Sequence, residues 1–218
     1  MNTEKLPDLC VVCCLWDANE STKDFSNMYT EEWVEKLYRG FKRHSTIPFE
    51  FICFTDRNRD FNEPITQEPL EGPLNYGALM EPYRLGRPMV LCGLDTMVVG
   101  NVDHLLEYCL TADELALPRD PFFPQTVCNG VALVPKDHVW VYVSYTNARD
   151  HIKGYAKDMD FMRSLQTGKV MDDLWPGSVV SYKGHVKDYG LDGVSIVYFH
   201  GEQKPHEIGE EFVREEWV

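Results

Sequence analysis

The first half of the chain contains three short runs of apolar residues, each of which ends at a polar residue. These runs cover 9–15, 49–55 and 89–94. A continuous apolar run of this length is typical of a strand that is buried on both faces. Between the first two runs, apolar residues of 30–44 recur at helical spacing, with a threonine at the start and basic residues at the end, as expected of a capped helix. This order of patterns predicts a right-handed βαβ unit.

Similar strand and helix patterns alternate along the rest of the chain. We predict strands at 65–70, 96–99, 114–117, 131–134, 179–182 and 194–199, and helices at 75–85, 103–110, 158–166 and 207–217. Residues 138–145 have strand-forming composition, but their flanks favour a helix, and we predict a helix with Val139, Tyr142 and Val143 facing inward. No repeat, low-complexity tract or linker is visible. We therefore expect one α/β domain over 1–218, with a Rossmann-like mixed sheet flanked by helices.

Composition narrows the class of partner. Hydrophobic residues make up 44% of the chain and aromatic residues 12%, so a substantial core is available. Lys and Arg total 21 against 35 Asp and Glu, which gives a formal net charge of −14. Because this charge repels phosphate backbones, we expect no extended duplex nucleic acid as a partner. The polar N-terminus and the short first apolar run indicate neither a signal peptide nor a membrane span.

The seven cysteines lie mostly within apolar runs, where cysteine behaves as a small hydrophobic residue. Cys10 and Cys13 form a C-x-x-C pair, but residues three apart on a strand face opposite sides of the sheet. We therefore expect cysteines of the core rather than a redox motif, in a protein of a reducing compartment, the cytoplasm.

Several side chains that can bind ligands follow the predicted strands. They are Trp16, Asp17, Thr55, Asp56 and Asp95. Taken singly, each is better explained as a loop residue, although Asp95 is balanced between a turn cap and a ligand contact. Taken together they predict a pocket, because ligands of such sheets bind beyond the C-terminal ends of the strands. A carboxylate at the end of a buried strand also needs a positive partner.

Three stretches of the sequence resemble the GT-A glycosyltransferases of the glycogenin and galactosyltransferase type, family 8. Residues 89–106 resemble the family segment L-D-x-D-T-x-V-x-x-N-x-D-x-L, and residues 199–206, F-H-G-E-Q-K-P-H, resemble its C-terminal H-x-x-G-x-x-K-P-W. Residues 29–56 look like the first βαβ unit of short bacterial and phage relatives, which share the ending F-H-G-x-x-K-P-H-E found at 199–207. The resemblance implies a single GT-A-like domain that transfers a sugar from a nucleotide-sugar donor, expected to be a UDP-sugar, with retention at the anomeric carbon.

The resemblance also implies a divalent metal, Mn²⁺ or Mg²⁺, held by the D-x-D carboxylates and the histidine. In this chain Gly93 replaces the first acid, so only Asp95 carries over. The position of the family's histidine falls on Tyr198, and His200 lies directly before Gly201 instead. We expect Asp95 and His200 to be the metal ligands, and the segments that carry them to converge on a diphosphate.

The remaining site residues are assigned by the same resemblance. Lys204 and Gly201 are expected to meet the phosphates, since lysine supplies a fixed positive charge and glycine lets the backbone approach closely. Asp172 and Asp173 are the candidate catalytic residues near the sugar, although they are equally well explained as loop carboxylates. The expected donor-binding residues are Trp16, Thr55, Asp56, Asp95, Asp120, Asn129, Gly201 and Lys204.

Two function hypotheses follow. The first is a glycosyltransferase whose acceptor is a glycan, a lipid-linked sugar, a small molecule or a modified nucleobase. The second is a non-catalytic nucleotide-sugar-binding module of the same fold, which Gly93 favours because the metal site has lost an acid. A plain Rossmann-type nucleotide enzyme has little support, because no G-x-G-x-x-G follows the first strand and no Walker lysine loop is present.

Overall fold

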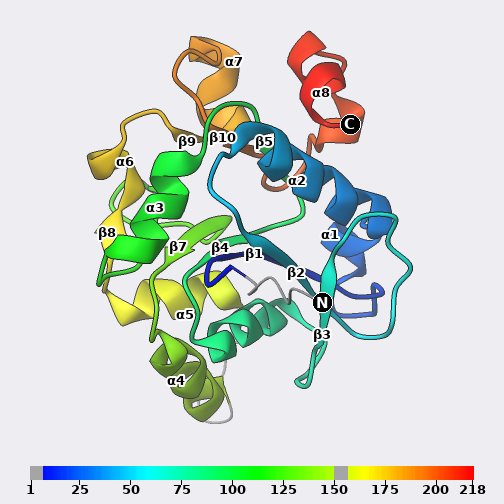
Figure 1. Ribbon diagram of the computed structural model, residues 1–218, viewed down its shortest axis with the longest axis vertical. Helices are drawn as coiled ribbons and strands as arrows, with labels where there is room; N and C mark the ends of the chain where they lie inside the picture. Colours follow the sequence, from blue (N-terminus) through cyan, green and yellow to red (C-terminus); the bar gives the residue numbers. More distant parts are fainter. Residues whose placement is uncertain (1–6, 150–156) are drawn as a thin grey trace, which may run out of the picture.

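The computed structural model describes residues 7–149 and 157–218, and these residues form a mixed sheet flanked by helices, as the sequence predicted (Figure 1). Within these ranges the main sheet has seven strands in the order β3-β2-β1-β4-β7-β6-β8. They are β1 (Cys10–Leu15), β2 (Glu50–Thr55), β3 (Thr66–Pro69), β4 (Met89–Cys92), β6 (Ala116–Leu117), β7 (Val131–Val134) and β8 (Lys169–Val170). β1 pairs in parallel with β2 and β4, whereas β7 is antiparallel to β4 and β6. The predicted βαβ unit is confirmed, since β1 and β2 are parallel neighbours.

A smaller sheet brings two distant parts of the chain together. In the described residues it has three strands, in the order β5 (Thr96–Val98), β10 (Ile196–Tyr198) and β9 (Val179–Ser181). β5 and β10 are antiparallel, with Thr96 opposite Tyr198. The backbone N–H of Phe199 then donates to the carbonyl oxygen of Asp95 at 2.8 Å. This register places the residue that precedes β5 beside the residues that follow β10.

Helices cover both faces of the main sheet. The helical segments are α1 (Lys23–Ser26), α2 (Glu31–His44), η1 (Tyr76–Leu85), α3 (Asp103–Thr111), α4 (Val139–Arg149), α5 (Asp158–Leu165), α6 (Met171–Leu174), η2 (Tyr182–Val186), α7 (Lys187–Tyr189), η3 (Pro205–Glu207) and α8 (Glu211–Glu216). Apolar residues of α2 and α3 pack on one face of β1 and β4, and those of η1, α4 and α5 pack on the other. In Figure 1, α2 lies above the main sheet and α4 and α5 lie below it.

The cysteines belong to the core, as expected. All seven are free and buried. Along β1, Cys13 packs with the cluster under α2, whereas Cys10 and Cys14 pack with the cluster under η1, as the alternation of side chains along a strand requires. Burial raises the pKa of the Cys10 thiol to about 12, so it stays protonated and unreactive near neutral pH.

The prediction of a helix at 138–145 is confirmed, but the inward orientation predicted for Val139 and Val143 is wrong. Val139 and Val143 are 37% and 48% exposed, whereas Val141 and Tyr145 are buried. Tyr142 is partly buried and packs against the core, as predicted. The cause is that α4 packs on η1 and α5, with the ring of Tyr145 centred 5.2 Å from that of Phe161. The composition of the segment does not indicate which face of the helix is buried.

The helix predicted at 207–217 is shorter than expected. A 3₁₀ turn, η3, is followed by an irregular stretch, and α8 begins only at Glu211. Gly209 lies in this stretch, and glycine destabilises a helix interior because it loses more backbone entropy than other residues. Among all the described residues, no helix is long and apolar enough to cross a membrane.

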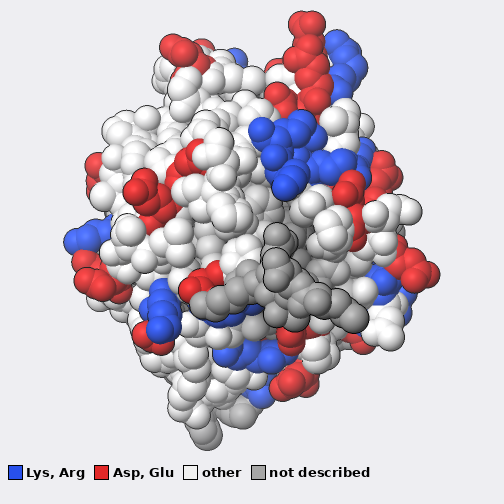
Figure 2. Space-filling view, in the orientation of Figure 1, with Lys and Arg blue, Asp and Glu red and all other residues white. Residues whose placement is uncertain are grey.

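Basic side chains gather over α2 on the face drawn in Figure 2, while acidic side chains are scattered over the same view. Three of the basic residues of α2, namely Lys36, Arg39 and Arg43, are paired with acids. Lys36 lies 3.0 Å from Glu32, and Arg43 lies 3.4 Å from Glu216 of α8. The basic cluster is therefore largely neutralised by acidic neighbours.

Candidate functional site

A cavity of about 540 Å³ opens beyond the C-terminal ends of β1 and β4. Six of the residues singled out in the sequence line it: Trp16, Asp95, Asn129, His200, Gly201 and Lys204. They come from the end of β1, the β4–β5 connection, the residues before β7 and the segment after β10. The cavity thus lies where parallel strands end, which is the usual ligand position in open α/β sheets. Its volume lies within the range of small-molecule sites.

Asp95 and Lys204 form an ion pair in the cavity wall. The Lys204 Nζ is in contact with Asp95 Oδ2, and the side chains are 6% and 19% exposed, respectively. The same Nζ donates to the carbonyl oxygen of Phe199 at 2.6 Å. The hydroxyl of Tyr29 also lies against the carboxylate, and burial together with the Asp95 charge raises the pKa of Tyr29. The predicted convergence of the two segments is therefore confirmed in the geometry.

His200 and Gly201 lie beside this pair. The Nε2 of His200 is 2.7 Å from the Oγ of Ser181. Burial lowers the pKa of His200, and the nearby Lys183 ammonium lowers it further. Gly201 has φ +66°, and a Cβ at this residue would lie 3.2 Å from the Nζ of Lys183. Glycine is favoured here because the left-handed backbone and the close ammonium both disfavour a side chain.

Asn129 and Asp158 form a polar pair in the cavity wall that the sequence did not reveal. The Nδ2 of Asn129 donates to Asp158 Oδ2 at 2.9 Å. The Oδ1 of Asn129 is buried and has no hydrogen-bond partner among the residues that the structure describes. Burial raises the pKa of Asp158, although the bond from Asn129 acts in the opposite direction. A free acceptor beside an acid of raised pKa can receive hydroxyl groups of a ligand.

The sequence signal at Asp158 was that of a helix start. The acid begins α5, and a carboxylate in a first helical turn is sufficiently explained by the helix dipole. No spacing connects it with Asn129, since only the packing of α5 against the end of the sheet brings them together. Tyr29 and Lys183 were missed for the same reason.

Thr55 and Asp56 lie at the predicted edge of the sheet but do not line the cavity. Thr55 is buried at the end of β2, opposite Leu15 in the register. Asp56 accepts from the backbone N–H of Asp17 at 3.0 Å and pairs with the buried Arg59. Both residues shape the end of the sheet behind the cavity wall. Their donor-binding role stays a prediction.

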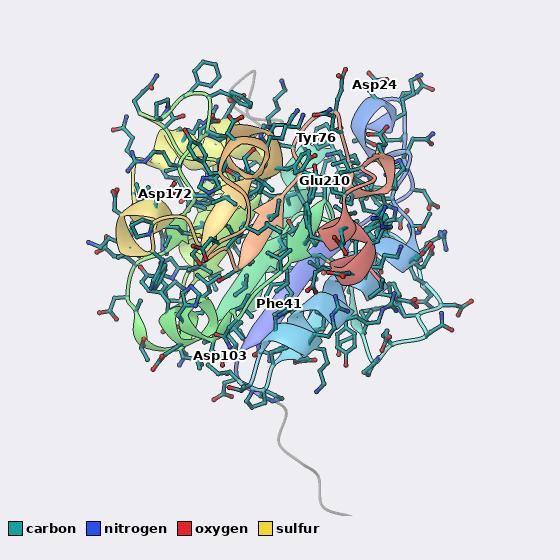
Figure 3. All side chains as sticks on the ribbon, turned by 90° about the horizontal axis from the view of Figure 1, so that it is seen from above. Asp24, Phe41, Tyr76, Asp103, Asp172 and Glu210 are labelled. Atoms are coloured by element: carbon teal, nitrogen blue, oxygen red, sulfur yellow. The ribbon has the colours of Figure 1, made fainter. Side chains whose placement is uncertain are left out.

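Asp120, Asp172 and Asp173 also lie outside the wall of the large cavity. Asp120 accepts from two backbone N–H groups of its own loop and pairs with Arg163, which does line the cavity. Asp172 accepts from the backbone N–H of Arg119 at 2.8 Å, and Asp173 pairs with the same arginine at 2.6 Å. Figure 3 shows Asp172 well to the side of Tyr76, which lines the large cavity. The catalytic role predicted for the two acids stays a prediction.

The donor groups do not fit a divalent metal. No group of three or more His, Cys, Asp or Glu side chains in the described ranges is arranged to hold one. Mn²⁺ or Mg²⁺ takes about six ligands, mainly oxygen. Here the Asp95 carboxylate is held by Lys204, the His200 Nε2 is held by Ser181, and Tyr198 turns its hydroxyl towards the Cys128 sulfur at 3.6 Å. The predicted Asp95–His200 ligand set is not assembled by these contacts.

No protein-family model matches the sequence, and no curated protein matches it significantly. Solved structures share the fold at low sequence identity. The bifunctional glycosyltransferase WbbM, in its apo form, matches with a TM-score of 0.64 and 10% identity over 94% of this chain and 48% of that chain. The galactosyltransferase LgtC, in complex with donor and acceptor sugar analogs, matches with a TM-score of 0.59 and 12% identity over 94% of each chain.

The glycosyltransferase GlyE from Streptococcus pneumoniae TIGR4 matches with a TM-score of 0.62 and 13% identity, over 90% of this chain and 55% of that chain. The chain thus spans about half the length of the WbbM and GlyE chains and nearly all of LgtC. Likeness at this identity is evidence of the fold. The chain has the GT-A-like fold of these glycosyltransferases, as the motifs of its sequence predicted.

Proposed function

We propose that the protein is a glycosyltransferase that moves a sugar from a nucleoside diphosphate sugar, a UDP-sugar by resemblance, to an acceptor. The observation that carries the proposal is the Asp95–Lys204 pair, which lies in the wall of a ligand-sized cavity at the C-terminal edge of the sheet. A buried lysine is costly unless its charge is used. In this place, the Lys204 ammonium suits the diphosphate of such a donor.

The chemistry assigns a task to each group. Transfer breaks the bond between the anomeric carbon and the diphosphate oxygen, while the acceptor hydroxyl bonds to that carbon and loses its proton. Negative charge develops on the departing diphosphate, and positive groups held in place lower the barrier. Lys204 is placed to meet that charge. Gly201 allows the backbone to approach the phosphates closely.

The sugar half of the donor suits the Asn129–Asp158 side of the cavity. The unpartnered Oδ1 of Asn129 can accept from a sugar hydroxyl, and the Asp158 carboxyl can donate or accept according to its protonation. Asp158 is thus a rival to Asp172 and Asp173 for the role near the anomeric carbon. Turnover of the three single Asp→Asn variants separates them, because only the residue that acts on the sugar should lower kcat strongly without loss of donor affinity. Retention at the anomeric carbon remains the expectation from resemblance.

The acceptor side is suggested by two exposed aromatic residues. Phe122 and Phe123 are 57% and 58% exposed, and the Phe122 ring is centred 5.2 Å from that of His200 in the cavity wall. Exposed aromatic side chains beside a pocket commonly mark a binding surface. An acceptor with a flat or apolar ring face, such as a glycan or a modified nucleobase, fits this position. The buried free thiols support a reducing compartment such as the cytoplasm.

The proposal is tested by titrating the protein with a panel of nucleoside diphosphate sugars in a calorimeter, with and without Mn²⁺, and by following release of the nucleoside diphosphate. We expect binding and slow hydrolysis of at least one donor, both lost in the double variant Asp95→Asn/Lys204→Met. Lys169→Met is the matched control, because Lys169 pairs with Glu114 on the surface away from the cavity. Absence of binding across the panel, with and without metal, would refute the proposal.

A non-catalytic binding module is the alternative, and the glycine at position 93 favours it. The module hypothesis expects donor binding of the same strength but no release of nucleoside diphosphate with any acceptor class. Turnover above the rate of the double variant excludes it.

A further inference from the structure

We infer that the diphosphate in this cavity is held without a divalent cation, by the ammonium groups of Lys204 and Lys183. The inference rests on the proposed function, since it concerns how the same cavity holds its donor. It departs from the metal that the resemblance implied. Three features of the described residues carry it: the position of Asp95, the contacts of His200 and the placement of the two lysines.

The Asp95 carboxylate occupies the space that a first acid would need. A Cβ at Gly93 would lie 2.9 Å from Asp95 Oδ1, which is too close for the two to coexist without a shift. The other oxygen, Oδ2, contacts Lys204, and the Tyr29 hydroxyl lies against the same carboxylate. The carboxylate is thus folded back over the glycine and held by a cation and a hydroxyl. This position of the Asp95 carboxylate therefore requires glycine, and not an acid, at position 93.

His200 is engaged elsewhere. Its Nε2 lies 2.7 Å from Ser181 Oγ, and that oxygen also accepts from the backbone N–H of Gly184 at 3.0 Å. The Ser181 hydroxyl can donate its own proton to the imidazole nitrogen. In that arrangement the ring proton of neutral His200 is on Nδ1, so neither nitrogen has a free lone pair for a metal.

Lys204 retains donor capacity for a ligand. An ammonium group has three N–H donors. One meets Asp95 and one meets the carbonyl oxygen of Phe199. The third can bind an oxygen of a ligand in the cavity that Lys204 lines. Asp95 therefore orients the Lys204 ammonium. In the family that the sequence resembles, the corresponding acid is expected to hold a metal.

Lys183 supplies a second positive charge beside two residues of the wall, Gly201 and His200. It lies in the π-helical turn η2, which the Ser181 side chain caps, and its Nζ sits over the bare backbone of Gly201. We find no carboxylate paired with it in the ranges 7–149 and 157–218. Asp95 balances the charge of Lys204, whereas the charge of Lys183 beside Gly201 has no such partner. Fixed cations placed at the departing oxygens act as a metal does in stabilising developing charge.

The test is a calorimetric titration of the whole chain with UDP, GDP, ADP and dTDP, in buffer with EDTA and again with Mn²⁺. We expect the best nucleoside diphosphate to bind with the same affinity in both buffers, within about twofold. Lys183→Met should weaken that affinity by about tenfold or more, because a charge-assisted hydrogen bond is lost, and Mn²⁺ should not restore it. Lys187→Met is the matched control, since Lys187 bonds to Gln203 on the surface.

Lys183 is the first variant because Lys204→Met leaves Asp95 buried without its partner and can unfold the chain. The double variant Asp95→Asn/Lys204→Met removes both charges, and a thermal melt verifies that it folds. Binding that appears only with Mn²⁺ and vanishes on adding EDTA overturns the inference while leaving the proposed function standing. Lack of binding in both buffers overturns both.

Discussion

The Asp95 carboxylate and the Lys204 ammonium depend on each other for their place in the protein. Both are buried enough that either charge alone would be poorly solvated. The sequence identified both residues and predicted that their segments meet. It did not predict that they meet each other, because the resemblance implied a metal between the acid and the phosphate. The pairing follows from the register of two short strands that are far apart in the chain.

Removal of one partner of this pair should cost more stability than removal of both. We expect Lys204→Met to lower the free energy of unfolding by about 3–5 kcal/mol, because Asp95 is left buried and uncompensated. Asp95→Asn/Lys204→Met should cost clearly less. Urea unfolding measures both, with the exposed pair member Lys169→Met as a control that changes stability by at most about 1 kcal/mol. If the loss in the double variant equals the sum of the losses in Lys204→Met and Asp95→Asn, the pair is not coupled.

We expect the Asp158 carboxylate to lower the stability of the folded protein while it contributes to turnover. Burial raises its pKa in the folded protein, so the folded state binds a proton that the unfolded state has released. Its contribution to stability therefore falls as the pH rises from the pKa of the unfolded carboxyl through the raised pKa, and the deficit stays constant above it. Asp158→Asn should remove this loss of stability. The Tm of the variant should therefore exceed that of wild type by a margin that grows as the pH rises through the two pKa values of Asp158. Turnover of the variant should decrease.

The control for this pH profile is Asp188→Asn, which changes an exposed acid outside the cavity wall. It should leave the shape of the Tm profile unchanged. If Asp158→Asn and wild type show parallel Tm profiles across acid and neutral pH, the buried carboxyl does not titrate as described.

Among the elements, the pairing of β5 with β10 decides where the site lies. Each strand has three residues, and the sequence of neither strand indicates which other strand it pairs with. The long apolar runs of β1, β2 and β4 were predictable because buried strands are apolar throughout. The face of α4 and the position of Asp158 were not, because each depends on which neighbour the element packs against.

Thr96 offers a test of the β5 environment. Its hydroxyl is buried and has no hydrogen-bond partner within the described part of the chain. Thr96→Val keeps the shape and removes the unsatisfied group, so we expect stability to rise by about 1 kcal/mol. Thr66→Val in β3 is the opposite case, since its hydroxyl donates to Glu50 at 2.8 Å, and it should lose about 1 kcal/mol. Denaturant unfolding compares the two, and a loss of stability in Thr96→Val would mean that the hydroxyl has a partner, such as a bound water.

For the whole molecule, the acidic balance separates a nucleotide site from a nucleic-acid surface. The net charge is −14, and three of the basic residues on α2, namely Lys36, Arg39 and Arg43, are paired with acids. We therefore expect no retention of a short DNA duplex at physiological ionic strength in a gel-shift assay, although single nucleoside diphosphates bind. A retained complex whose affinity falls steeply with salt would contradict this, because that dependence is the signature of phosphate contacts.

The order of strands and helices made the overall fold predictable, since alternating patterns leave few topologies for a sheet with right-handed crossovers. The order of strands and helices does not predict where the loops lie relative to the cavity. Asp172 and Asp173 were chosen by their position in the sequence, yet both bind Arg119 beside a second cavity of about 200 Å³. Long-range packing decides which loop reaches the ligand.

The most direct test of the central claim is a crystal structure of the protein grown with UDP. Our account predicts the diphosphate in the large cavity, with a phosphate oxygen about 3 Å from the Nζ of Lys204 and a second contact from Lys183. A diphosphate bound away from Lys204, or held there only through a metal ion ligated by Asp95 and His200, would contradict it.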